Sequence, residues 1–333
     1  MGRIIRMGSP ANSFRFASIL NTAGPFLGLL FVVGLFALSA DLRPHFFSGA
    51  NFKIILIQTV IVAIGALGMT LIIISGGIDL SVGSVVALAS VLGATSLKQG
   101  YAPATVIVFV VCAGGLIGLL NGAIIAGLRM MPFIVTLGMM GVARGTAKWL
   151  SGSQTVNAPE TAINSMMARM EPTQLFPLPP GVWITVGLAL FMSLVMRQTI
   201  FGRYVFAIGS NEATARLCGI RVPLFKVLIY TLAGLFFGLS GLMQLSRLTQ
   251  GDPTVAIGLE LDIIAAVVIG GASLNGGTGS ILGSMIGALI MAVLRNGTNQ
   301  MGWPTYMQEI IIGAVIILAV GLDRLRQARA RVS

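Results

Sequence analysis

The residues that come nearest to a catalytic motif lie in a glycine-rich loop late in the chain. Its sequence, Gly271-Ala-Ser-Leu-Asn-Gly276-Gly277-Thr278, follows the phosphate-binding pattern G-x-x-x-x-G-K-[ST] except at one position. That position holds Gly277 instead of the lysine that reaches the β- and γ-phosphates of a nucleotide. No other stretch offers a candidate loop, so the chain is not expected to hydrolyse ATP. Any energy that it uses must come from a partner protein or from an ion gradient.

Titratable side chains are scarce: the chain has ten acidic residues and one histidine, His45. Asp79, Glu260, Asp262 and Glu309 lie at the ends of apolar stretches, and no carboxylate lies in the middle of one. A carrier coupled to protons or sodium needs such groups at mid-membrane depth, so their shortage favours a neutral polar substrate. Glu260 and Asp262 begin a short apolar stretch, where their charge complements the helix dipole. One histidine and two cysteines leave no expected metal site, cofactor site or catalytic residue.

Asp79, in the segment Ser75-Gly-Gly-Ile-Asp-Leu-Ser-Val-Gly83, has two interpretations. An aspartate just before an apolar run can cap the next helix, and we favour capping and loop shaping. It can also line a substrate path where the helix is broken. Polar residues inside apolar stretches share this ambiguity, and for any one of them a bond between helices is the simpler interpretation. The candidate path residues are Gln58, Thr70, Asp79, Ser81, Asn121, Thr136, Ser273 and Asn275.

A polar segment, Asn211-Glu-Ala-Thr-Ala-Arg-Leu-Cys-Gly219, separates two long apolar stretches in the most basic loop of the chain. It is too short and too polar to cross a membrane. Its pattern, Glu-Ala-x-x-x-x-x-Gly, suits a short helix that docks on a soluble partner such as a separate ATPase. An ordinary interfacial helix is the alternative. The residues expected to make this coupling contact are Asn211, Glu212, Ala213, Arg216 and Gly219.

The elements that must position these residues are apolar helices. The chain is 56% hydrophobic and only 9% charged, whereas soluble proteins are about 25% charged. With a mean hydropathy of +0.94, it is predicted to be an all-α integral membrane protein. A window of about 19 residues suits helices that cross the hydrocarbon core. It identifies ten spans, of which the third, sixth and eighth are short enough to be tilted, broken or re-entrant: 22–40, 54–74, 82–97, 103–128, 133–150, 181–196, 225–245, 260–272, 279–295 and 305–322.

Ten spans place both termini on one side of the membrane. Of the 21 Lys and Arg residues, 13 fall on that side, so the positive-inside rule makes both termini cytoplasmic. This topology accounts for the net charge of +11 without nucleic acid. The predicted organisation is a cytoplasmic arm (1–21), a transmembrane domain (22–323) and a basic cytoplasmic tail (324–333). Inside the domain, residues 151–180 form a periplasmic loop and residues 197–224 form the cytoplasmic coupling loop.

Two glycine-rich loops resemble each other and indicate a possible internal repeat. Gly76-Gly-Ile-Asp-Leu-Ser-Val-Gly83-Ser84 is similar to Gly270-Gly-Ala-Ser-Leu-Asn-Gly-Gly-Thr-Gly279-Ser280, with two extra residues in the second. Each follows an apolar run and leads into another. Matching interruptions in two halves of a transporter point to a substrate path between them. A chance match between two glycine-rich loops is the alternative.

Five segments of this chain together resemble the ribose-type sugar permeases of bacterial ABC importers, over roughly residues 50–325. They are Gly76–Gly83, Pro132–Gly138, Phe201–Gly219, Leu259–Gly271 and the run from Thr305 to the basic tail. Asn211–Gly219 resembles the coupling helix of that family, although Thr214 stands where the related loops more often have Ala or Lys.

The resemblance implies a multi-pass permease of the bacterial inner membrane that imports a monosaccharide or polyol by alternating access. It implies three kinds of protein partner: an ATPase with tandem nucleotide sites, a periplasmic sugar-binding protein and a second permease copy. A homodimer is expected, and a heterodimer with a related permease is the alternative. An ion-coupled secondary sugar transporter remains the alternative function. The resemblance does not identify the sugar, because selectivity in this family lies largely in the binding protein.

Overall fold

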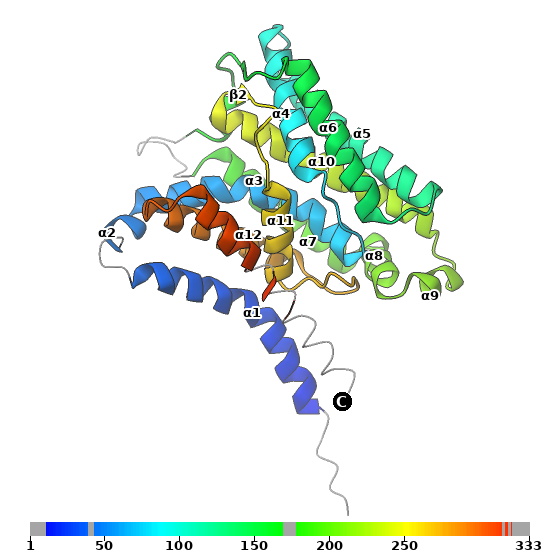
Figure 1. Cartoon of the computed structure of the whole chain (residues 1–333). Coiled ribbons are helices and arrows are strands. Elements are labelled where there is room, and N and C mark those ends of the chain that lie inside the picture. Colours follow the sequence, from blue (N-terminus) through cyan, green and yellow to red (C-terminus); the bar gives the residue numbers. More distant parts are fainter. Residues whose placement is uncertain (1–10, 39–42, 169–177, 315–316, 319–320, 322–333) are drawn as a thin grey trace, which may run out of the picture.

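A computed structural model describes residues 11–38, 43–168, 178–314, 317–318 and 321, and most of them are helical (Figure 1). A helix suits a membrane span because it satisfies its own backbone hydrogen bonds, and lipid offers none. The elements in chain order are α1 (Ala11–Ala37), α2 (Arg43–Phe46), α3 (Gly49–Ile74), α4 (Val82–Lys98), α5 (Pro103–Gly127), α6 (Pro132–Ser151), β1 (Val156–Asn157), the 3-10 helix η1 (Asn164–Met166), α7 (Pro180–Gln198), α8 (Ile200–Ser210), α9 (Glu212–Leu217), α10 (Val222–Leu248), β2 (Gln250–Gly251), α11 (Leu259–Ile269) and α12 (Ile281–Gln300).

Within the described residues, five helices are long and apolar enough to cross a membrane: α3, α5, α7, α10 and α12. The predicted spans from 22–40 to 279–295 each overlap a helix. However, α11 has only 11 residues, or about 16 Å of rise against a hydrocarbon core of about 30 Å. The tenth predicted span is helical over 305–314, and most of its remainder lies outside the described residues. A multi-pass helical protein is confirmed, whereas the number ten, the side of the termini and the internal repeat stay predictions.

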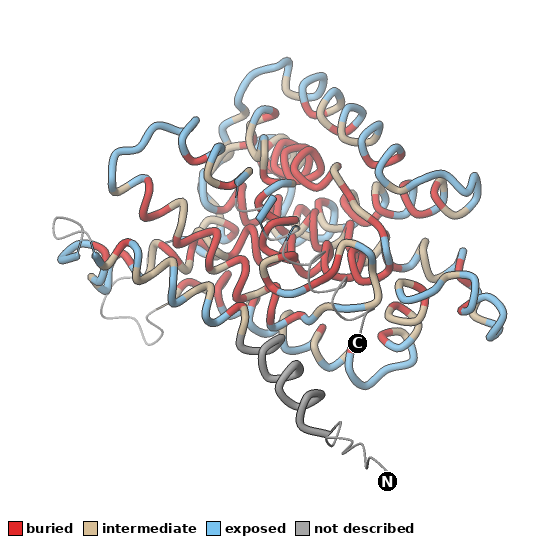
Figure 2. Tube along the Cα trace, turned by 60° about the horizontal axis from the view of Figure 1, so that its bottom comes forward, coloured by how far each residue is buried: buried red, intermediate tan, exposed pale blue. Residues whose placement is uncertain are grey.

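Helix α3 forms the centre of the molecule and contacts α7, α10, α11 and α12. Every residue from Val60 to Ser75 is buried. A helix that is apolar on all sides is expected in a core, where it has no face to present to solvent. Figure 2 shows buried residues concentrated in the middle of the molecule, with exposed residues around the outside.

Close packing between α5 and α10 depends on glycines. A methyl group added at Gly114 or Gly118 of α5 would overlap backbone atoms of Gly234 or Tyr230 in α10. Small residues of this kind let membrane helices approach closely without a large hydrophobic driving force.

The loop predicted at 151–180 carries the one departure from an all-α fold among the described residues. Strands β1 and β2 pair antiparallel over two residues each, with Val156 opposite Gly251. The pairing attaches this loop to the end of α10. Residues 169–177 of the loop, residues 1–10 of the predicted N-terminal arm and the basic tail 324–333 lie outside the described residues.

Candidate functional site: the coupling segment and the polar path

The predicted coupling residues form a short helix with a cap at each end. The Asn211 side chain accepts a hydrogen bond from the Thr214 backbone N–H at 2.9 Å and so begins α9. At the other end, Gly219 has a φ of +84°. The Gly219 N–H donates to the Arg216 carbonyl, and the Ile220 N–H donates to the Ala215 carbonyl. These two bonds form a Schellman motif, which glycine favours because it has no Cβ. We name α8, α9 and the turn after α9, residues 200–220, the coupling segment.

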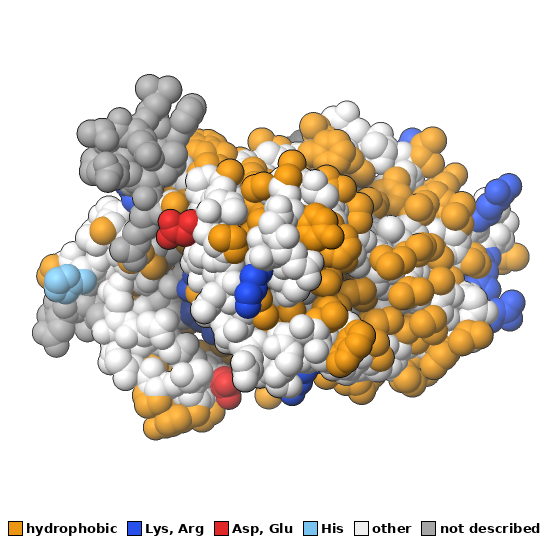
Figure 3. Space-filling model, turned by 90° about the horizontal axis from the view of Figure 1, so that it is seen from above, with side chains coloured by type: hydrophobic (Ala, Val, Ile, Leu, Met, Phe, Trp, Pro, Cys, Tyr) orange, Lys and Arg blue, Asp and Glu red, His pale blue; other side chains and the backbone are white. Residues whose placement is uncertain are grey.

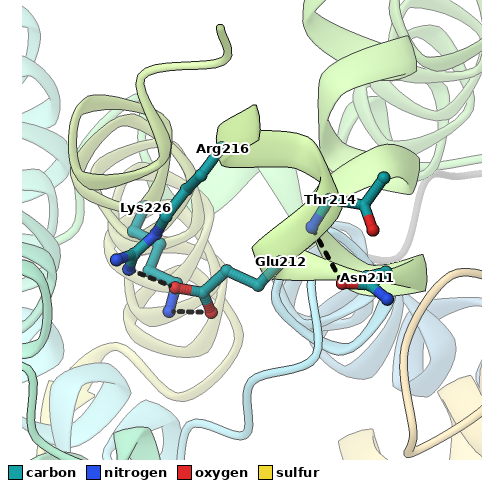
Figure 4. A network of polar contacts seen from close by, with 5 residues as sticks. All are labelled: Asn211, Glu212, Thr214, Arg216 and Lys226. Atoms are coloured by element: carbon teal, nitrogen blue, oxygen red, sulfur yellow. Dashed lines mark hydrogen bonds and ion pairs between the residues drawn. The ribbon is translucent and has the colours of Figure 1, made fainter. Parts of the chain in front are cut away.

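Glu212 fixes the position of α9 against the next long helix. Its carboxylate accepts from Arg216 at 2.6 Å within α9 and from Lys226 of α10 at 2.7 Å (Figure 4). Partial burial raises the pKa of Glu212. The hydrogen bonds and positive charges of Lys226 and Arg216 together lower it by more, so the pKa of Glu212 is below its ordinary value. The carboxylate therefore stays charged and paired at neutral pH.

One side of α9 packs on the protein and the other side is free. Ala215 is buried against Ile208 and Val222. Ala213, Arg216 and Leu217 are exposed, and Leu217 is 89% exposed. An exposed leucine beside a small alanine suits a docking surface better than a solvated helix. The sequence argument identified Ala213 and Arg216 but not Leu217, which the spacing of apolar residues did not single out.

The coupling segment touches both glycine-rich loops through backbone atoms. The Gly277 N–H donates to the carbonyl oxygen of Ile74, the last residue of α3, at 2.8 Å. Gly209 of α8 lies so close that an added methyl group would overlap the same Ile74 oxygen. A methyl group at Gly276 would lie 2.7 Å from the Gly209 oxygen and 3.0 Å from the Gly76 Cα. We name this meeting point of 74–77, 209–210 and 276–277 the glycine junction.

Four of the predicted path residues come together beside the first loop. Asp79 is buried, and its Oδ1 accepts from the Ser81 backbone N–H at 2.7 Å and from the Ser81 hydroxyl at 2.6 Å. Asn121 of α5 donates to Ser81 Oγ at 3.2 Å. Thr136 of α6 accepts from the Leu80 N–H at 3.2 Å. Asp79 thus shapes the loop through its bonds to Ser81. The expectation that it caps the next helix is wrong, because Ser81 occupies the N-cap position of α4.

The other four path residues lie elsewhere. Thr70 donates to Ser284 Oγ at 2.7 Å and so joins α3 to α12, which is the simpler interpretation given above for such residues. Ser273 and Asn275 lie in the second glycine-rich loop, where the Asn275 N–H donates to Ser273 Oγ at 3.3 Å. Gln58 lines a polar cavity between α3, α10, α11 and α12. The eight residues therefore do not form one continuous site.

Comparison with known proteins identifies the family of this chain. The family described as "Branched-chain amino acid transport system / permease component" matches residues 51–320. The chain belongs to this permease family. No solved structure matches it.

Several sugar import permeases are similar to this permease over nearly its whole length. The ribose import permease RbsC of Escherichia coli K12 is 39% identical and covers 90% of this chain and 93% of its own. The fructose import permease FrcC of Rhizobium meliloti is 35% identical over 89% of this chain and 84% of its own. The galactose/methyl galactoside import permease MglC of Escherichia coli K12 is 32% identical over 97% of this chain and 100% of its own. The permease is therefore a multi-pass membrane protein, and the resemblance to sugar permeases is confirmed.

Proposed function

We propose that this chain is the transmembrane subunit of an ATP-binding-cassette importer that carries a monosaccharide or polyol across the bacterial inner membrane. The observation that carries the proposal is the length of the match to relatives, which are import permeases for ribose, fructose and galactose. A separate ATPase with tandem nucleotide sites binds the exposed face of α9, on the cytoplasmic side with both termini. A periplasmic binding protein delivers the sugar to the opposite side.

The environment of Gly277 supports a separate source of energy. In a phosphate-binding loop the backbone N–H groups point at the phosphates. Here the Gly277 N–H bonds to Ile74, and Ser210 packs against Gly277. In the loop that comes closest to a nucleotide-binding motif, the Gly277 N–H is thus already used in a hydrogen bond within the protein. This favours a transport subunit that is not itself an enzyme.

Reconstitution in liposomes tests the importer against the ion-coupled alternative. The chain alone is expected to show no sugar uptake when a proton or sodium gradient is imposed. Uptake should begin only when the ATPase, the binding protein and ATP are all supplied. Gradient-driven uptake by the chain alone would establish a secondary transporter and overturn the proposal.

The outer faces of α5 and α6 support contact with lipid or with a second permease. They expose Val108, Phe109, Leu116, Leu119, Leu120, Phe133, Ile134, Leu137, Val142 and Trp149. Figure 3 shows hydrophobic side chains over much of the upper side of the molecule, with some of the Lys and Arg side chains at its right margin and others scattered over the view. An apolar surface of this extent is typical of a membrane or protein interface.

Native mass spectrometry of the purified complex tests the proposed homodimer. One chain offers one coupling segment, whereas two nucleotide sites call for two such contacts. The expected result is two copies of this chain in each complex. A single copy together with a related permease would establish a heterodimer instead.

A further inference from the structure

A polar cavity lies at the end of the helix bundle away from the coupling segment. Its volume is about 240 Å³, and it is bounded by α3, α10, α11, α12 and the turn before α11. Its polar lining residues are Gln58, Gln244, Arg247, Asp262, Arg295 and Asn299. They come from segments up to 241 residues apart in sequence, so only the tertiary fold brings them together.

Helices α3 and α10 each run from the cavity toward the coupling segment, so their lengths give the distance between the two. Gln58 precedes Ile74 of the glycine junction by 16 residues along α3, which is about 24 Å of helix. Gln244 follows Lys226, the partner of Glu212, by 18 residues along α10, which is about 27 Å. The cavity is thus on the side where a binding protein would release its ligand if the ATPase binds α9.

The cavity holds polar atoms whose bonding capacity is not used. Asp262 is 2% exposed and its Oδ2 pairs with Arg295 Nη2 at 2.5 Å. Among the described residues, Asp262 Oδ1, Arg295 Nε and Gln58 Oε1 have no hydrogen-bond partner although they are buried. Because a buried polar group without a partner is costly, such groups are normally paired with protein, water or a ligand.

The chemistry of these groups defines the ligand that would satisfy them. A carboxylate accepts, a guanidinium donates and an amide does both, while each hydroxyl of a ligand can donate and accept. Of the charged lining residues, Arg247 and Arg295 are basic and Asp262 is acidic, and Asp262 pairs with Arg295. The other three polar lining residues, Gln58, Gln244 and Asn299, are neutral amides, so the lining suits a ligand with many hydroxyls better than a metal ion.

We infer that this cavity is the site where the permease receives a neutral monosaccharide or polyol from the side opposite the coupling segment. The inference rests on the proposed function and names the residues that would hold the substrate. Gln58 and Gln244 contact its hydroxyls, and the Asp262–Arg295 pair offers an acceptor and a donor side by side.

Uptake by the reconstituted complex of permease, ATPase and binding protein tests this site. The probe is whichever of ribose, fructose, arabinose or galactose the wild-type complex imports. Gln58→Leu and Gln244→Leu should each lower the uptake rate at saturating binding protein about tenfold or more, because a site built to bond hydroxyls loses that much per lost bond. Assembly, thermal unfolding in detergent and ATP hydrolysis without sugar should stay at wild-type levels.

Thr59→Val provides the matched control one residue along α3. Thr59 bonds to the Ile55 carbonyl of its own helix and lines a separate apolar hollow, so its uptake should equal that of the wild type. If Gln58→Leu impairs folding, Gln58→Asn keeps the amide and should still lower uptake. Wild-type uptake in the Gln58 and Gln244 variants would overturn the cavity assignment alone. A wild-type complex that imports no sugar would instead overturn the proposed function.

Discussion

Ala213→Arg should abolish sugar uptake and sugar-stimulated ATP hydrolysis while leaving the permease folded. Ala213 is exposed on the free side of α9, so an arginine there can extend into solvent and need not disturb the packing of α9. It would instead occupy the space that a docked ATPase needs. Loss of about 2 kcal/mol at the centre of an interface weakens binding more than tenfold. The measurement is uptake and ATPase activity of the complex in liposomes, with Ala213→Ser as the control of similar size.

Gly219→Val should give the same loss through a different cause. Gly219 has nothing within 4 Å of an added Cβ, so the substitution causes no clash. Its φ of +84° is the obstacle, since a β-branched residue is strained there. The end of α9 would change shape and shift Leu217 from its exposed position. Gly219→Asn is the control, because asparagine tolerates this backbone conformation.

Two outcomes separate coupling from a merely interfacial helix. If Ala213→Arg and Gly219→Val assemble normally and keep wild-type uptake and ATPase activity, α9 does not couple. If the variants fail to assemble with the ATPase but the permease remains monodisperse in detergent, the docking surface is supported directly.

Local features of the coupling segment could be predicted from the sequence, because they depend on neighbours in the chain. Asn211 begins α9 and Gly219 ends it with positive φ, as capping preferences indicate. The pairing of Glu212 with Lys226 and the exposure of Leu217 depend on how α10 packs after the turn. No spacing rule supplies that geometry.

The substrate path could be predicted only in part, for a similar reason. Asp79 and Ser81 are two residues apart, and their bond is a local turn. Thr136 bonds to the same loop from 56 residues away, and Asp262 pairs with Arg295 across two helices. Helix-dipole reasoning placed Asp262 correctly in the first turn of α11. It gave no sign of Arg295, since periodicity shows which face of a helix is polar but not which helix will meet it.

The glycine junction leads to a prediction in which two physical effects have opposite signs. Gly209 lies in helix α8, where replacing glycine by alanine ordinarily stabilises a helix by up to about 1 kcal/mol. Here the added methyl group would overlap the Ile74 carbonyl oxygen and lie 2.7 Å from the Gly277 N–H nitrogen. The Ile74 oxygen and the Gly277 nitrogen are backbone atoms that are joined by a hydrogen bond. Neither can therefore move aside as the end of a flexible side chain would.

Gly209→Ala should therefore destabilise the permease and uncouple it. Overpacking of this kind costs about 1–3 kcal/mol, which exceeds the gain in helix propensity. The expected result is a lower unfolding temperature in detergent, together with sugar uptake reduced more strongly than ATP hydrolysis, because the coupling segment is displaced from both glycine-rich loops. Gly138→Ala in α6 is the matched control, since nothing lies within 4 Å of its added Cβ. It should raise the unfolding temperature slightly or leave it unchanged. A Gly209→Ala variant that is stabilised like Gly138→Ala and transports normally would show that the junction transmits nothing, and α8 would then be a passive connection to α9.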